Sequence, residues 1–322
     1  MELYPLKFTP ILKEKLWGGT KLKDILNKPI DSDITGESWE ISAVPGDISV
    51  VSNGNLAGKS LQELIDFYGK DLMGESVIER FGREFPILIK FIDAKQDLSI
   101  QLHPNDALAR ERHNSFGKTE MWYVMDGDKD ANLIVGFNKE VTKDEYVASI
   151  ENDTLLDLMN YETVKEGDTF FINTGKIHAI GAGVLLAEIQ QTSDVTYRVF
   201  DFNRRDKDGN LRELHTELAL EAIDYSKKDD FKVVYEKETN KANTMVHCPY
   251  FKTDFLELTE DKTIDTSKRD SFTIYMCVGG EATVQNEWGE ASIKKGESLL
   301  VSAMTSSITI KTSSAKLLEV TI

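Results

Sequence analysis

The sequence predicts a mainly β protein of two β-barrels, with helical segments inserted in and around the first barrel. Apolar and polar side chains alternate along several segments of the first two thirds of the chain, as they do on strands with one buried face. Roughly the last eighty residues form short strand-like segments separated by turn signals at regular spacing. Two helix-start signals, at Ser60 and Thr142, lie in the first two thirds, so the helices are expected there.

The strands of the first barrel are predicted from composition and alternation. Residues 85–92, FPILIKFI, predict a strand buried on both faces, in which the charge of Lys90 is out of place. Other strands are expected within residues 4–52, where turn clusters interrupt a β-like pattern, and at residues 131–137, 162–172, 184–191 and 195–202.

Helices are predicted by start signals followed by apolar residues at helical spacing. The capping box Ser60-x-x-Glu63 begins a helix that ends near Gly69. A second capping box, Thr142-x-x-Glu145, begins a helix that runs to about residue 159. Shorter helices are expected at residues 75–81 and 215–225.

Two charged, polar runs, at residues 226–230 and 237–243, have the composition of a surface linker. We place the boundary after residue 236, which gives a first domain of residues 1–236 and a second of residues 237–322. Short strands in the second domain are expected at residues 251–258, 271–278, 281–285, 297–301, 307–311 and 315–321, a rhythm that suggests a jelly roll.

Charge and composition exclude several classes of function. The 322 residues carry a formal net charge of -17, which argues against nucleic acid or an anionic membrane as a partner. No stretch has the pattern of a signal peptide or of a membrane span, so a cytoplasmic protein is expected. Cys248 and Cys277 are too few for a disulfide framework and are expected to be small buried residues. The oligomeric state stays open, with a homo-oligomer as one possibility.

Side chains that bind metals share one face of a predicted strand. Successive side chains on a strand point to opposite faces, so Gln101 and His103 point the same way. Glu120 lies on the next predicted strand, with six residues between it and Gly127, and His178 ends a segment of strand and turn character. These four polar side chains could therefore converge on one cation inside the first barrel.

Two imidazoles, a carboxylate and an amide oxygen that leave room for water or substrate suit a catalytic zinc ion, and manganese, cobalt or iron would also fit. Gln101 is the weakest of the four, because a neutral amide is a poor ligand, and it could equally be a hydrogen-bonding group beside the ligands. A lone histidine is usually a satisfied core or surface group, so His113, His215 and His247 are not expected to bind metal.

The spacing of these residues resembles the paired motifs of the cupin superfamily: a histidine strand, a glutamate shortly before a glycine, then a glycine, a tight turn and a final histidine. Asn173 stands where the second motif usually carries proline, which alters the turn and removes no ligand. The insert between His103 and Glu120 is longer than in an ordinary small cupin. The resemblance implies two cupin barrels, which are double-stranded β-helices of the jelly-roll type.

Within the cupins, the chain resembles the type I mannose-6-phosphate isomerases, the zinc-dependent form. The resemblance is carried by WGG at residues 17–19, GESWEIS at residues 36–42, LSIQLHP, GKTEMWYV, GKIHAIG and SDVTYRVFDFNR. It runs through most of the first two thirds, and the chain lacks the large helical insertion of longer members. It implies one Zn²⁺ per chain in the N-terminal cupin, held by His103, Glu120, His178 and Gln101.

The resemblance also implies the catalytic residues. Arg198, in the last of these motifs, matches the family's catalytic residue. A guanidinium stays protonated, so we expect it to clamp substrate and stabilise negative charge. A surface ion pair with Asp194 or Asp201 is the alternative. The general base stays open between Lys118, two residues before a metal ligand, and Glu188, which could instead be an ion-pair partner.

For a substrate phosphate the resemblance points to Ser99 and Lys90. Ser99 shares the face of the metal ligands, and a lysine within FPILIKFI must find an anion or reach solvent. A lysine that snorkels to solvent is the competing account. Together Lys90, Lys118 and Arg198 would offset the acidic surface, which otherwise repels a phosphorylated sugar.

The function that these residues favour is a metal-dependent aldose–ketose isomerase, which interconverts mannose 6-phosphate and fructose 6-phosphate by proton transfer through an enediol. A divalent ion on the sugar oxygens would stabilise the developing negative charge. A non-catalytic sugar-binding cupin and a cupin metal-dependent oxygenase are the alternatives. The ligand set with Arg198 and Lys118 argues against the first, and oxygenase sites are usually richer in histidine.

The second barrel is expected to lack a metal site. GESLLVSAMTSS, residues 296–307, has the same lead glycine and length as GDTFFINTGKIH, residues 167–178. Ser307 stands at the position of the histidine, and Met304 at that of the turn glycine. We therefore expect a structural role for this barrel, and a metal bound in it would refute that.

Overall fold

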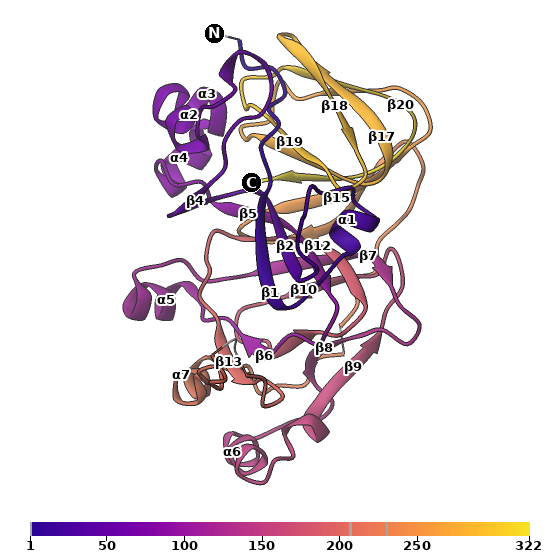
Figure 1. The fold of residues 1–322 in the computed structure, drawn as a ribbon. Helices are drawn as coiled ribbons and strands as arrows, with labels where there is room; N and C mark the ends of the chain where they lie inside the picture. Colours follow the sequence, from indigo (N-terminus) through magenta and orange to yellow (C-terminus); the bar gives the residue numbers. More distant parts are fainter. Residues whose placement is uncertain (1, 206–207, 230) are drawn as a thin grey trace.

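The structure is a computed structural model that describes residues 2–205, 208–229 and 231–322. Figure 1 shows two lobes, with the C-terminal sheet above and the strands of the first lobe below. The N-terminal segment crosses to the upper lobe, where Leu6 forms a β-bridge with Leu300. The first residues of the chain are therefore part of the contact between the lobes.

Two antiparallel sheets face each other in the first lobe. Within the described residues, one is six-stranded, in the order β1-β2-β5-β12-β7-β10, and the other is five-stranded, in the order β13-β6-β11-β8-β9. The six-stranded sheet contains β1 (Ile11–Gly19), β2 (Thr35–Ile41), β5 (Ile87–Ala94), β7 (Glu120–Gly127), β10 (Thr169–Ile172) and β12 (Val184–Gln191). The five-stranded sheet contains β6 (Ile100–Leu102), β8 (Asn132–Phe137), β9 (Met159–Thr163), β11 (His178–Ile180) and β13 (Tyr197–Phe200).

This arrangement confirms the predicted mainly β class and the jelly-roll type, although the strands of the described residues form two separate hydrogen-bonded sheets and no closed barrel. A hairpin of β3 (Ala43–Val44) and β4 (Asp47–Ile48) follows the second strand. The predicted strand at residues 162–172 is wrong as a single element. It divides into β9 and β10 because a turn intervenes, in which Gly167 has a φ of +85°.

The strand β5 is buried along its whole length, as predicted, because its two faces pack against different cores. Ile89 and Phe91 belong to a core shared with the second lobe, whereas Ile92 belongs to the core between the two sheets of the first lobe. Lys90 alternates with Ile89 and Phe91 and therefore shares the face of Ile92. The lysine that was out of place in the sequence thus points between the sheets.

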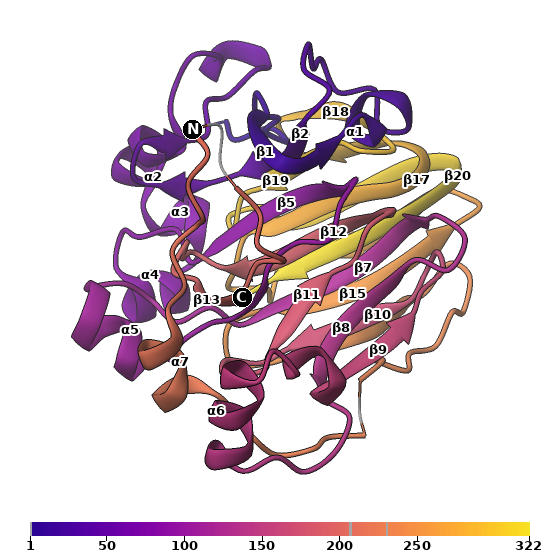
Figure 2. The same ribbon diagram turned by 60° about the horizontal axis from the view of Figure 1, so that its bottom comes forward.

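The described helices are short (Figure 2), and those within residues 61–81 lie beside the second lobe, where the backbone N–H groups of Phe272 and Ala303 donate to the carbonyls of Met73 and Leu72. Both predicted capping boxes are formed, at Ser60 and Thr142, and the prediction for residues 75–81 is confirmed. The helices are α1 (Lys21–Asp24), α2 (Leu61–Tyr68), α3 (Lys70–Met73), α4 (Glu75–Phe81), α5 (Asp106–His113), α6 (Lys143–Glu151) and α7 (Thr216–Ala222), with 3-10 turns at Gly54–Leu56 and Leu155–Leu158.

Two helical features differ from the sequence prediction. The helix α6 ends at Glu151 and not near residue 159, because Asp153 adopts a φ of +55° and the chain then enters a 3-10 turn that leads into β9. The helix α5 was not predicted, and it fills the long insert between His103 and Glu120. This insert is therefore ordered structure and directly adjoins two candidate ligands.

The second lobe is a seven-stranded sheet among the described residues. Its strands are β14 (Ala242–His247), β15 (Lys252–Leu258), β16 (Lys262–Asp265), β17 (Thr273–Asn286), β18 (Gly289–Lys294), β19 (Ser298–Val301) and β20 (Ser307–Thr321). Four of the short strands predicted here are wrong as separate elements, since they merge pairwise into the long strands β17 and β20. The Gly279-Gly280 pair resembles a turn in sequence but forms a bulge, at which the register with β20 shifts.

The two lobes share one core. The largest apolar cluster includes Met121 and Ile189 from the first lobe with Phe255 and Leu318 from the second. The domain boundary after residue 236 stays a prediction; of the two predicted linkers, the one at residues 226–230 ends at a residue outside the described ones. The search of the described helices for a segment long and apolar enough to cross a membrane finds none.

Candidate metal centre and active site

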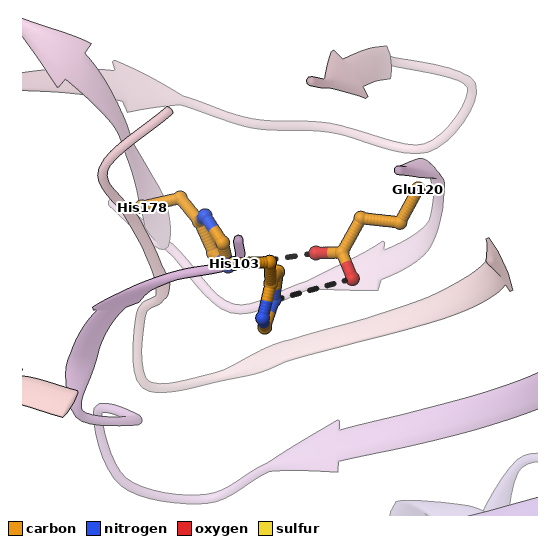
Figure 3. Close-up of side chains that lie close together, drawn as sticks. All are labelled: His103, Glu120 and His178. Carbon is orange, nitrogen blue, oxygen red and sulfur yellow. Dashed lines mark ion pairs between the residues drawn. The ribbon is translucent and has the colours of Figure 1, made fainter. Parts of the chain in front are cut away.

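Three side chains that were predicted as metal ligands meet between the two sheets, and we call them the ligand cluster: His103, Glu120 and His178. His103 follows β6, while Glu120 and His178 begin β7 and β11. The Nε2 atoms of His103 and His178 lie 3.6 and 3.5 Å from the two carboxylate oxygens of Glu120, as Figure 3 shows. All three residues are 1% exposed, and their ligand atoms lie within 4.8 Å of one another.

Backbone carbonyls determine which nitrogen of each histidine faces the cluster. Nδ1 of His103 lies 2.9 Å from the carbonyl oxygen of Val195, and Nδ1 of His178 lies 2.8 Å from that of Lys176. Because a carbonyl only accepts hydrogen bonds, each Nδ1 must donate, which leaves a lone pair on each Nε2. Both Nε2 atoms therefore present a metal-binding lone pair toward Glu120.

The protein itself leaves the ligand atoms unsatisfied. Both Nε2 atoms and Oε2 of Glu120 are buried without a hydrogen-bond partner, although Nζ of Lys118 lies 3.2 Å from that oxygen in poor hydrogen-bond geometry. Burial lowers the pKa of His103 well below its ordinary value and that of His178 to about 4, so neither ring carries a proton at Nε2 near neutral pH. Two neutral imidazoles and a carboxylate fit a divalent cation such as Zn²⁺.

Gln101 faces the same space as the ligand cluster. It pairs in register with His178 on one side and with Arg198 on the other, and directly opposed residues of antiparallel strands point to the same face. Its Oε1 accepts a hydrogen bond of 3.3 Å from the hydroxyl of Ser99. The row Arg198–Gln101–His178 thus crosses three strands of the five-stranded sheet.

A second row of polar side chains crosses the six-stranded sheet opposite. Trp39, Lys90, Glu188 and Trp122 are consecutive register partners on β2, β5, β12 and β7. Nζ of Lys90 lies 3.0 Å from Oε1 of Glu188, and the indole N–H of Trp122 donates to Oε2 at 2.8 Å. Nζ of Lys90 also lies over the Trp39 ring, 5.2 Å from its centroid. The ammonium therefore makes both an ion pair and a cation–π contact inside the protein.

The charges of this row are kept in the interior by one another. Burial alone lowers the pKa of Lys90, but Glu188 and Glu37 outweigh it and raise that pKa above its ordinary value. Burial alone raises the pKa of Glu188, but Lys90 and Lys118 hold it below its ordinary value. Lys90 therefore pairs with an anion, as predicted, and that anion is Glu188. Because Lys90 is only 6% exposed, its ammonium does not extend to solvent, so the alternative of a snorkelling lysine is not supported.

The two rows enclose a cavity of about 340 Å³. Seven predicted site residues line it: Lys90, Ser99, Gln101, Lys118, His178, Glu188 and Arg198. His103 and Glu120 adjoin these residues through the ligand cluster. The structure therefore brings all nine predicted site residues to one place, from segments up to 108 positions apart in the chain.

The cavity also contains residues that the sequence analysis did not assign. Trp17, Glu37 and Trp39 come from the two quoted motifs WGG and GESWEIS, in which alternation along a strand could have shown them. Lys15 pairs with Glu37 at 3.3 Å, and Arg212 lies in a loop without any sequence signal. The N-terminal strands β1 and β2 thus contribute to the cavity wall that the six-stranded sheet forms.

Arg198 lies on β13 with its guanidinium at the cavity. Its Nη1 donates to the carbonyl of Glu213 at 2.9 Å, and it forms no ion pair with a carboxylate of the described residues. Asp201, one of its two alternative partners, instead accepts from Nε of Arg212 at 2.6 Å and from its Nη2. Burial and the neighbouring Arg212 lower the pKa of Arg198, yet a guanidinium stays charged at neutral pH. The surface ion-pair interpretation of Arg198 is therefore not supported.

The histidines that were not expected to bind metal have other surroundings. Nε2 of His113 lies 2.9 Å from the hydroxyl of Tyr197, and Nδ1 of His215 accepts from the backbone of Arg198. His247 is exposed. Among residues 231–322 no group of three His, Cys, Asp or Glu side chains has metal-binding geometry, and the expectation that the second lobe lacks a metal stays a prediction.

Comparison with known proteins gives consistent matches. The family model of the phosphomannose isomerase type I catalytic domain matches residues 5–135, and that of the mannose-6-phosphate isomerase cupin domain matches residues 241–322. The mannose-6-phosphate isomerase ManA of Bacillus subtilis is 38% identical over 304 residues, which are 94% of each chain. The mannose-6-phosphate isomerase of Streptococcus mutans is 40% identical over 69% of each chain.

Solved structures agree with the sequence relatives. The crystal structure of the mannose 6-phosphate isomerase from Bacillus subtilis has a TM-score of 0.88 at 34% identity and covers 99% of both chains. The apo form of the Salmonella typhimurium enzyme has a TM-score of 0.77 at 17% identity, which shows a common fold.

Proposed function

This chain belongs to the type I phosphomannose isomerase family, and on that premise we propose that it interconverts mannose 6-phosphate and fructose 6-phosphate in the cavity between its two N-terminal sheets. The observation that carries the proposal is the placement of Lys118, Glu188 and Arg198 around one cavity with the ligand cluster. A ligand set alone would suit many cupins, whereas a cationic clamp and a proton carrier beside it suit an isomerase.

We propose Zn²⁺ as the metal, held by His103, Glu120 and His178 with Gln101 as a fourth ligand. The unsatisfied Nε2 atoms and the carboxylate support this choice, since zinc prefers nitrogen and oxygen donors of this kind. When bound, the ion supplies Lewis-acid polarisation of the sugar oxygens. The carbonyl acceptors at Val195 and Lys176 support the ligands by holding both rings in one tautomer.

The reaction moves a hydrogen from C2 to C1 and a proton from O2 to O1 through an enediol. We assign the carbon-to-carbon transfer to Lys118, because Oε2 of Glu188 accepts from the indole N–H of Trp122 and its Oε1 lies 3.0 Å from the ammonium of Lys90, although without hydrogen-bond geometry. Glu188 then serves to hold Lys90 in place. The guanidinium of Arg198 binds the sugar oxygens and stabilises their negative charge as the C2 proton leaves.

Ser99 and Lys90 are the residues that we assign to the substrate phosphate. Both residues line the cavity. The ammonium of Lys90 has three N–H donors and contacts Glu188 through one oxygen, so donors remain for a phosphate. The positive charges of Lys90, Lys118 and Arg198 at the cavity support anion binding by a protein whose overall charge is -17. A cytoplasmic location stays a prediction from the sequence, and the oligomeric state stays open, with a homo-oligomer as one possibility.

The function is tested by incubating the protein with mannose 6-phosphate in heavy water and following fructose 6-phosphate by NMR. We expect turnover that a chelator abolishes and Zn²⁺ restores. Deuterium at C1 of the product would show that the transferred hydrogen exchanges with solvent. The absence of turnover with any divalent metal would contradict the proposal and favour a binding protein without catalysis.

A further inference from the structure

The backbone on both sides of Lys118 is held by side chains. Lys118 precedes β7, and its own N–H makes only a long contact of 3.4 Å with the carbonyl of Pro104. The N–H of Gly117 donates to Oδ1 of Asp106 at 2.8 Å, and the N–H of Thr119 donates to Oε1 of Gln191 at 2.8 Å. The direction in which the Lys118 side chain leaves the backbone is thus determined by these two acceptors.

The two acceptors are bonded to each other. Nε2 of Gln191 donates to Oδ1 of Asp106 at 3.1 Å, and its backbone N–H donates to the carbonyl of Thr119 at 3.0 Å. The backbone of Gly117 also lies against α5 so closely that an added Cβ would be 2.7 Å from the amide nitrogen of Asp106. The first turn of α5, the end of β12 and the Lys118 segment are therefore joined in one hydrogen-bonded unit.

The second lobe completes this unit. The hydroxyl of Tyr250, in the turn between β14 and β15, donates to Oδ2 of Asp106. One carboxylate oxygen thus serves the Lys118 segment and the other serves a residue of the opposite lobe. Since Glu120 follows Lys118 by two positions, the same unit precedes both a proposed proton carrier and a metal ligand.

We propose that Asp106, Gln191 and Tyr250 are positioning residues, which hold the Lys118–Glu120 segment in its reactive place, and that the second lobe contributes to catalysis through Tyr250 without touching substrate. This inference rests on the proposed isomerase function, because it concerns the orientation of Lys118, the proposed proton carrier. It gives the second lobe a role in the reaction besides its share of the common core.

Three variants test the network in the zinc-loaded full chain. Asp106→Ala removes both acceptor oxygens, and we expect kcat to fall about 10- to 100-fold with little change in KM, as is usual when the support of a reactive group is lost. Asp106→Asn should retain most activity, because its amide oxygen can accept from Gly117 and Gln191 while its amide N–H₂ donates to the Tyr250 hydroxyl. Tyr250→Phe should lower kcat less than Asp106→Ala does.

Two matched controls remove hydrogen bonds of the same kind elsewhere. Asp270→Ala removes the carboxylate that accepts from the backbone N–H groups of Glu75 at 2.6 Å and of Ser76 at 2.8 Å, two hydrogen bonds that also join the lobes. Tyr235→Phe loses a phenolic hydrogen bond of 2.8 Å to the carbonyl of Gly167. We expect kcat to be unchanged in both controls, even if their thermal stability falls as much as that of the test variants.

Hydrogen exchange gives a readout that is independent of activity. The amides of Gly117 and Thr119 should exchange faster in Asp106→Ala and Tyr250→Phe than in the parent, but not in the controls. An active parent whose kcat does not respond to Asp106→Ala or Tyr250→Phe, or whose kcat falls equally in the controls, would overturn the network. An inactive parent would instead overturn the proposed function. Tyr250→Phe decides the question if Asp106→Ala does not fold.

Discussion

At the scale of single residues, the site depends on side chains whose polar atoms the protein cannot satisfy alone. Each cluster histidine donates through Nδ1 to a carbonyl, and its Nε2 is left buried without a partner. A buried polar atom without a partner costs about 1–3 kcal/mol, so such a cluster is stable chiefly when a cation completes it. Around the cluster, Lys90 pairs with Glu188 and Lys118 with Glu120, whereas Arg198 has no carboxylate partner among the described residues.

The unpaired charge of Arg198 leads to a prediction. Arg198→Ala should lower kcat about 10²- to 10³-fold, because a donor to the developing negative charge is lost. Zinc content, measured by metal analysis, should not change, since Arg198 is outside the ligand cluster. The control is Arg110→Ala. Arg110 lies on α5, and within the described part of the chain its guanidinium donates a hydrogen bond only to the side chain of Asn114. Loss of zinc from the Arg198 variant would assign this residue a structural role.

Glu37 gives a prediction for pH. Burial alone raises its pKa, but Lys90 and Lys15 outweigh burial and lower it to about 2, from an ordinary value of 4.5. A carboxyl group with a lowered pKa in the folded state stabilises the fold above its unfolded pKa, and that stability is lost as the pH falls from about 4.5 toward 2. The shift corresponds to roughly 3 kcal/mol at neutral pH.

Comparison of the parent with Glu37→Gln isolates this contribution from the other carboxylates. Urea unfolding of the metal-free proteins measures the free energy of unfolding of each. The parent should have the larger value, and the difference between parent and variant should be constant above pH 5 and shrink as the pH is lowered toward 3. A difference that does not vary with pH would show that the charge of Glu37 does not stabilise the folded protein and that the variant differs only through packing and hydrogen bonding.

At the scale of elements, the site is a matter of register between strands. Lys90, Glu188 and Trp122 meet because they are direct partners on three neighbouring strands. A shift of one residue in either pairing would turn one of these side chains to the opposite face, into the apolar core that the lobes share. The apolar residues on either side of Lys90 and Glu188 secure this register, since they are buried on the other face.

The buried pair on these strands leads to a third prediction. Lys90→Met leaves the Glu188 charge without its closest partner and should destabilise the protein by about 3–5 kcal/mol. The double variant Lys90→Met/Glu188→Gln should regain part of that loss, because no unpaired charge remains. Urea unfolding measures both effects, and a double variant that is as unstable as the sum of the single changes would contradict the coupling.

A second buried pair serves as the control for function. Lys28 and Glu40 lie 2.6 Å apart and are equally buried, but they do not line the cavity. Lys28→Met should therefore destabilise the protein to a similar extent without changing substrate binding. Binding can be followed by intrinsic fluorescence, since three of the four tryptophans line the cavity.

At the scale of the whole molecule, metal binding and folding are linked. The ligand cluster joins β6, β7 and β11, which are distant in sequence, so the unfolded chain does not present the site. Zn²⁺ should therefore stabilise the folded protein, by about 4 kcal/mol at a free concentration a thousand times the Kd. Thermal unfolding with and without a chelator measures this stabilisation.

Variants of two histidines make this fourth prediction specific. His103→Ala should abolish the stabilisation by Zn²⁺, because a ligand is lost. His113→Ala also removes a hydrogen-bonded histidine, but it should leave the response to Zn²⁺ intact. Equal stabilisation of the parent and His103→Ala by Zn²⁺ would place the metal outside the ligand cluster.

The sequence by itself determined features that depend on neighbouring positions. The capping boxes at Ser60 and Thr142 and the buried strand around Lys90 follow from local sequence signals, and the structure agrees with each. Local signals failed where the geometry between segments decides the outcome. The Gly279-Gly280 pair is a bulge and not a turn, because the partner strand β20 continues past it.

Only the tertiary structure decided which polar residues meet. The pairing of Glu188 with Lys90 and the contact of Tyr250 with Asp106 join positions 98 and 144 residues apart, and the cavity brings Trp17 to Arg198, 181 positions later. The physical reason is that alternation along a strand records which face a side chain occupies, whereas the side chain opposite it depends on the pairing and packing of separate strands. The sequence therefore predicts which face a side chain occupies, but not which side chains of other strands lie beside it.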